Sequence, residues 1–73
     1  ATKGNGVDVE YLEGRLKATQ YKIGRLEIYY TISMHYKNKG NKKKEAETLS
    51  IMEKEGGKTW FKRWAEDRRE EIK

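Results

Sequence analysis

The chain has 73 residues, of which 34% are hydrophobic and 40% are charged, and its formal net charge at pH 7 is +5. A chain of this length forms one domain at most, and its core is small because a domain of this size buries only about 60% of its unfolded surface. It has no cysteine and a single histidine, which excludes disulfides and a thiolate zinc site as sources of stability.

We therefore expect residues 1–73 to form a single small domain that gains stability by association, as a homo-oligomer or as a subunit of a larger assembly. No apolar run approaches the roughly 18 residues that span a membrane. The absence of cysteine fits a reducing compartment. We expect the protein to lie in the cytoplasm, or within a virion or another assembly.

Glycines divide the chain into three predicted helical segments. The breaks at Gly40 and at 56–57 leave segments at roughly 7–37, 42–55 and 58–73. The absence of proline and the high content of charged residues favour helices over an all-β fold. The sequence therefore predicts an all-α fold, in which one long helix and two shorter helices form a helical hairpin or small bundle.

The first segment carries an apolar seam. Its residues recur at alternating spacings of three and four, which is typical of a coiled coil or a helical hairpin: Val9, Leu12, Leu16, Thr19, Ile23, Leu26, Tyr30 and Ser33. Asp8 can cap the start of this helix. Gly14 and Gly24 each cost a helix about 1 kcal/mol relative to alanine, but both lie off the seam and leave its register unchanged.

A strand is the alternative for residues 25–37. There, apolar residues alternate strictly with mostly polar ones, as in a strand with one buried face. On a helical wheel the same apolar residues point all round, which a helix tolerates only when neighbours surround it. We favour a helix, and the alternative is an α+β fold with a strand at 25–37.

Tyrosines are frequent for so short a chain, with five among 73 residues. Tyrosine is favoured in subunit contacts, where one end of the side chain is buried and the other is wet. Together with the all-round apolar stretch, this predicts a subunit interface made by Tyr11, Tyr21, Ile28, Tyr29, Ile32 and Tyr36.

The net charge of the whole chain comes from one short stretch. Residues 37–44 contain five lysines and no carboxylate, whereas charges in the rest of the chain nearly balance. Such a cluster attracts polyanions. The stretch predicts a lysine-rich turn that binds phosphates through Lys37, Lys39, Lys42, Lys43 and Lys44. The alternative interpretation is a solvated turn that keeps the protein soluble.

The last segment is predicted to be an amphipathic helix. Its aromatic residues, Trp60, Phe61 and Trp64, fall on one arc of the wheel, and with Leu49, Met52 and Ile72 we expect them to cover the apolar seam of the first helix. Aromatic residues interleaved with cations are also typical of single-stranded nucleic-acid binding. This adds Lys58, Lys62 and Arg63 as candidate polyanion-binding residues.

The carboxylates from Glu45 onward alternate with lysines and arginines, and we expect them to be solvating charge rather than a general acid–base pair. No catalytic, metal-binding or cofactor-binding motif is present. Two classes of function remain. The first is a non-enzymatic protein that binds nucleic acid or another polyanion without sequence specificity, and the second is a structural subunit, such as a small virion component.

Overall fold

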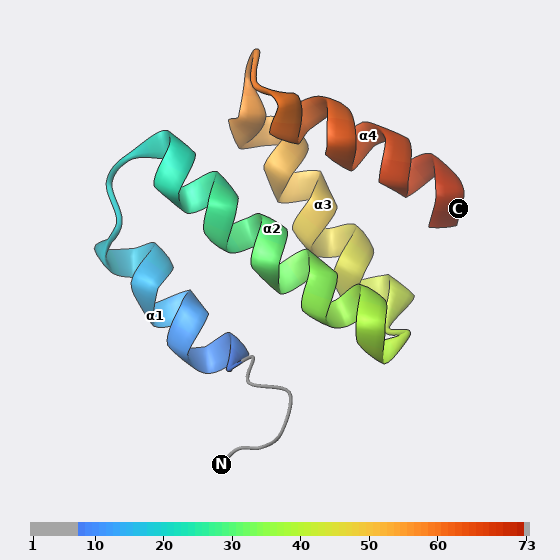
Figure 1. The fold of residues 1–73 in the computed structure, drawn as a ribbon, viewed down its shortest axis with the longest axis horizontal. Helices are drawn as coiled ribbons and strands as arrows, with labels where there is room; N and C mark the ends of the chain where they lie inside the picture. The colour runs from blue at the N-terminus through green and yellow to red at the C-terminus, as the bar shows by residue number, and fades with distance from the viewer. Residues whose placement is uncertain (1–7, 73) are drawn as a thin grey trace.

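The computed structural model describes residues 8–72, which form four helices (Figure 1). These are α1 (Val9–Ala18), α2 (Lys22–Lys39), α3 (Lys42–Gly56) and α4 (Trp60–Ile72). Within residues 8–72 there is no strand. The all-α prediction is confirmed, and the alternative of a strand at 25–37 is wrong.

The predicted long first helix is divided in two, and this part of the prediction is corrected. Thr19 has an extended backbone (φ −94°, ψ 124°), and its hydroxyl donates to the Arg15 carbonyl at 2.6 Å. Tyr21 is also extended, with φ −79° and ψ 130°. The chain therefore reverses between them, and α1 lies alongside α2 (Figure 1).

The four helices lie side by side in a flat layer. Figure 1, which looks along the shortest axis, shows them with little overlap, and the Cα atoms extend over 36 × 30 × 15 Å. The main contacts join consecutive helices: α1 with α2, α2 with α3, and α3 with α4. The buried apolar side chains therefore lie at the seams between neighbouring helices, and the layer keeps two broad faces.

The core lies where α2, α3 and α4 meet. It consists of Leu26, Leu49, Met52, Phe61 and Ala65, with Tyr29, Tyr30, Trp64 and Ile72 packed against it. Ile28 and Ile32 are also buried, but they lie outside this cluster. Ile28 is about 200° from Leu26 on the helical wheel, on the side of α2 that α1 covers.

The position of α2 between two neighbours explains the pattern that resembled a strand. Its apolar residues point all round because α3 packs on one side and α1 on the other. The two neighbours contribute unequally. No residue of α1 is fully buried, whereas α2, α3 and α4 each contribute buried side chains.

A buried ion pair fixes α4 on α3. Only 1% of the Glu45 side chain is exposed, and Arg68 binds it with two hydrogen bonds, Nε to Oε2 at 2.6 Å and Nη2 to Oε1 at 3.3 Å. The hydrogen bond to Glu45 is the main reason that the pKa of Arg68 is raised above its ordinary value. The expectation that Glu45 is solvating charge is therefore wrong, because its carboxylate points inward to a partner that lies 23 residues away.

A tight glycine turn joins α3 to α4. Gly57 has φ 58° and ψ −122°, a conformation that residues with a side chain rarely adopt. A Cβ atom on Gly56 would lie 2.8 Å from the Cβ of Lys62 and 3.0 Å from its backbone nitrogen. The Thr59 hydroxyl donates to the Gly56 carbonyl at 2.7 Å and closes the end of α3.

Replacing Arg68 by leucine is expected to lower the free energy of unfolding by about 2–3 kcal/mol, because it leaves the Glu45 carboxylate buried without a partner. The double variant Glu45→Leu with Arg68→Leu should regain most of this loss, since no buried charge remains. Urea unfolding followed by circular dichroism measures both. Arg69→Leu is the control: it breaks a half-exposed pair with Glu53 and should cost about 1 kcal/mol or less. Equal stability of the Arg68→Leu protein and the original would contradict the role of the pair.

Gly56→Ala is expected to lower stability by about 1–3 kcal/mol, because the added methyl group meets the backbone of Lys62. Gly14→Ala should instead raise stability by about 0.5–1 kcal/mol, since no atom lies within 4 Å of the new methyl group in α1. Thermal unfolding of the two variants gives both shifts, and the prediction fails if they have the same sign.

Candidate polyanion-binding surface

The five clustered lysines lie on either side of a short turn between two helices, in the end of α2 and the start of α3. Gly40 ends α2 in the left-handed conformation (φ 74°, ψ 18°), and its N–H donates to the Lys37 carbonyl at 3.1 Å. Asn41 then caps α3, because its Oδ1 atom accepts the N–H of Lys44 at 3.2 Å. The turn between the helices is thus only two residues long. We call this end of the molecule the lysine tip, defined by Lys37, Lys39, Lys42, Lys43 and Lys44.

All five side chains of the lysine tip are exposed, and within residues 8–72 none of them forms an ion pair. Lys37 and Lys39 lie in the last turn of α2, where a positive charge is favourable. Lys42–Lys44 lie in the first turn of α3, where each positive charge opposes the helix dipole by about 0.3–1 kcal/mol. The nearest carboxylate, Glu45, is turned inward to Arg68 and does not reach the tip.

The lysines point to different sides of the tip. Lys44 lines a groove together with Leu16 of α1 and Tyr36 of α2. Lys42 lines a second groove, whose other members include Glu53 and Glu66. These two carboxylates have basic partners of their own, at 2.8 Å from Arg69 and 3.1 Å from Lys62 respectively. Glu70 also lines this groove, and Lys42 forms no ion pair within residues 8–72.

The candidates in the last segment do not join the lysine tip. Lys62 is 3.1 Å from Glu66, and Arg63 is 3.7 Å from Asp67, so both bases already have carboxylate partners one turn along α4. Lys58 is exposed and has no ion pair among the described residues, but it lies beyond the far end of α3. A helix of this length is roughly 22 Å long. The predicted set of eight bases therefore forms two separate regions.

The predicted interface residues differ in exposure, although Tyr29, Ile32 and Tyr36 line one groove. Tyr11 and Tyr21 are 61% and 83% exposed, whereas Ile28 and Ile32 are buried within the chain itself. Tyr29 and Tyr36 are half-buried. An interface on Tyr11 and Tyr21 stays a prediction, while the two isoleucines serve the packing of α2.

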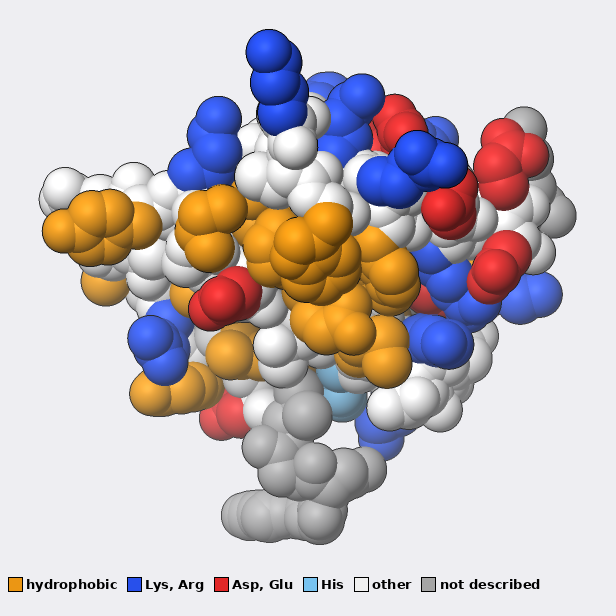
Figure 2. Space-filling model, turned by 45° about the horizontal axis from the view of Figure 1, so that its top comes forward, with side chains coloured by type: hydrophobic (Ala, Val, Ile, Leu, Met, Phe, Trp, Pro, Cys, Tyr) orange, Lys and Arg blue, Asp and Glu red, His pale blue; other side chains and the backbone are white. Residues whose placement is uncertain are grey.

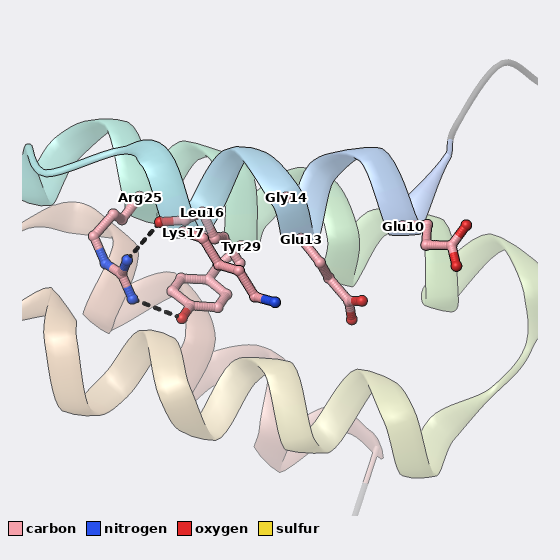
Figure 3. Close-up of a pocket in the computed structure, with 7 residues that line it drawn as sticks. All are labelled: Glu10, Glu13, Gly14, Leu16, Lys17, Arg25 and Tyr29. Atoms are coloured by element: carbon pink, nitrogen blue, oxygen red, sulfur yellow. Dashed lines mark hydrogen bonds between the residues drawn. The ribbon is translucent and has the colours of Figure 1, made fainter.

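Tyr29 belongs to a polar network that links three helices. The Arg25 guanidinium donates from Nη2 to the Tyr29 hydroxyl at 3.1 Å and from Nη1 to the Leu16 carbonyl of α1 at 2.9 Å (Figure 3). Its Nε atom donates to Glu55 of α3 at 3.1 Å. Burial, followed by the charge of the Glu55 carboxylate, raises the pKa of Tyr29 above its ordinary value. The phenol is therefore held neutral.

The hollow beneath α1 in Figure 3 is lined by Glu10, Glu13, Gly14, Leu16, Lys17, Arg25 and Tyr29. Its two most enclosed polar groups, the Arg25 guanidinium and the Tyr29 hydroxyl, already bond to each other and to Glu55. These residues act as a structural link rather than as groups aimed at a ligand.

An exposed aromatic cluster was not predicted. Trp60 was expected in the core, but it is 57% exposed because it is the first residue of α4 and lies at an open edge of the layer. Its ring stacks on Phe61 at 4.0 Å and meets Tyr30 edge-on at 5.6 Å. Figure 2 shows hydrophobic side chains gathered in the middle of one face, with Lys and Arg side chains along its upper edge.

Comparison with known proteins gives no family: no protein-family model, curated protein or solved structure matches the chain. None of the helices among residues 8–72 is long and apolar enough to cross a membrane. The same residues contain no group of three or more His, Cys, Asp or Glu side chains that could hold a metal ion.

Proposed function

We propose that the protein binds nucleic acid, or another polyanion, through the lysine tip and without reading sequence. The observation that carries this proposal is that five exposed lysines flank one two-residue turn and that none has an ion pair within residues 8–72. Several other bases have carboxylate partners: Arg25, Lys62, Arg63, Arg68 and Arg69. The bases outside the tip without an ion pair among the described residues, such as Arg15, Lys17 and Lys54, are spread over α1 and α3.

Folding by itself does not favour this charge arrangement. Lys42, Lys43 and Lys44 oppose the dipole of α3, and their charges repel one another across the turn. The backbone N–H groups of Lys42 and Lys43 lie in the first turn, where a helix offers them no acceptor. A bound phosphate would meet both the ammonium groups and these N–H groups, and it would convert the penalty into a gain.

The residues of the tip support binding without sequence readout. Lysine presents a compact positive charge that contacts phosphate, and phosphate contacts carry no sequence information. The one capping amide, Asn41, uses its oxygen inside the turn. A non-enzymatic role is part of the same proposal, because the groups of the tip suit charge neutralisation rather than bond making.

A structural subunit of a larger assembly is the second candidate. One observation favours it: the aromatic cluster around Trp60 leaves apolar surface exposed on a thin molecule. The two candidates are compatible, because the lysine tip and Trp60 lie near opposite ends of α3.

Substituting glutamine for Lys42, Lys43 and Lys44 is expected to weaken binding to duplex DNA and to single-stranded oligonucleotides, measured by fluorescence anisotropy at several salt concentrations. With five phosphates neutralised, the unmodified protein should show a log–log salt slope of about −4 on duplex DNA. The triple variant should lose about one unit of slope for each lysine removed.

The matched control replaces Arg15, Lys17 and Lys54 by glutamine. These residues are also exposed and have no ion pair among the described residues, so the variant has the same net charge as the first. It should retain most of the affinity and of the slope. Equal losses in both variants would show that only net charge matters, and a binding constant that does not respond to salt would reject the proposal.

A further inference from the structure

An open apolar groove runs between α2 and the start of α4. It is lined by Ile23, Glu27, Tyr30, Thr31, Thr59, Trp60 and Phe61. We propose that this groove binds the same groove of a second copy of the chain, so that two copies form a twofold-symmetric dimer with their broad faces together.

The groove has the composition of a protein contact. Ile23 is 49% exposed and Trp60 is 57% exposed, which makes them two of the most exposed large hydrophobic side chains of residues 8–72. Trp60 is also held in place by Phe61 and by Tyr30, whose ring in turn meets Trp64 at 4.8 Å. Rigid aromatic side chains at the centre of a patch are typical of residues that dominate binding energy.

The flat shape leaves this face uncovered. Domains normally bury their helices between two packed layers, but here the helices pack mainly on their neighbours in chain order within one layer. A second copy placed face to face supplies the missing layer. It also gives Trp60 the apolar surroundings that its own chain does not provide.

The charges around the groove of one copy complement those of a second copy. Glu27 lines the groove and has no ion pair among the described residues. Cations lie outside the lining, toward the glycine turn: the Nζ atom of Lys22 is 3.7 Å from the Cβ position of Gly57, and Lys58 follows Gly57 in the chain. Figure 2 shows Lys and Arg side chains along the upper edge of this face. Lys22 precedes Glu27 by five residues, which is roughly 7.5 Å along α2.

A twofold axis through the groove would place Glu27 of each copy opposite the cations of the other copy. In such an interface each residue of the patch faces the patch of the other copy, so the carboxylate end meets the cationic end twice. A polyanion is a poorer occupant, because the only charged side chain lining the groove is the carboxylate of Glu27. The groove therefore fits a second copy better than it fits nucleic acid.

Sedimentation equilibrium of the full chain without nucleic acid tests this proposal. We expect a concentration-dependent dimer, and Ile23→Glu should raise its dissociation constant about tenfold or more because it places an unpaired carboxylate in the contact. Ile51→Glu is the matched control. Ile51 is 38% exposed but lines a different groove, beside Leu16 and Tyr29, so its variant should dimerise normally.

A charge exchange tests the symmetry. Glu27→Lys alone, and Lys22→Glu with Lys58→Glu together, should each weaken the homodimer because they place like charges opposite one another. An equimolar mixture of the two variants should form a heterodimer with affinity close to that of the original protein, since both contacts then join opposite charges. Circular dichroism checks that all variants stay folded.

Four results would overturn the proposal. One is a monomeric mass at every concentration up to about 1 mM, a range that covers even weak association. The second is a dimer that Ile23→Glu leaves intact, and the third is a mixture of the charge variants that stays monomeric. The fourth is quenching of tryptophan fluorescence by a thymidine oligonucleotide that Trp60→Leu abolishes, which would assign the groove to nucleic acid. None of these results depends on the lysine tip, so the two proposals fail or survive separately.

Discussion

The ion pair between Glu45 and Arg68 is the interaction on which the remaining features depend. It joins the first turn of α3 to the third turn of α4 and fixes how these helices lie across one another. It also removes from the surface the carboxylate nearest to the clustered lysines. The same contact that holds α4 on α3 therefore turns the carboxylate that follows Lys44 in the chain away from the lysine tip.

The flat arrangement of helices separates the two candidate surfaces. Because α3 runs from the lysine tip to the glycine turn, the cationic end of the molecule and the aromatic groove lie roughly one helix length apart. Of the bases near the groove, Lys62 and Arg63 are paired with carboxylates of α4, whereas no lysine of the tip has an ion pair within residues 8–72. One end is thus suited to phosphates and the other to an apolar partner.

The sequence predicted local features well and long-range ones poorly. The choice of helix over strand at 25–37 and the position of the lysine-rich turn depend on residues close in the chain, and the structure confirms both. The break after α1 was missed because the spacing of the apolar seam continues from Leu16 through Thr19 to Ile23. The inward position of Glu45 and the exposure of Trp60 were missed because each is decided by where α4 lies, and no periodicity records that.

The unequal burial of the helices has a consequence for motion. Helix α1 contributes no fully buried side chain, and the Arg25 guanidinium is bonded to its backbone at Leu16. Helix α1 can therefore separate from α2 at a lower free energy than the other helices can separate from each other. The amide hydrogens of α1 would then exchange with solvent through a sub-global opening, while those of α3 would exchange only on complete unfolding. Each opening uncovers Ile28 and Ile32, so the least anchored helix also shields the most apolar flank of α2.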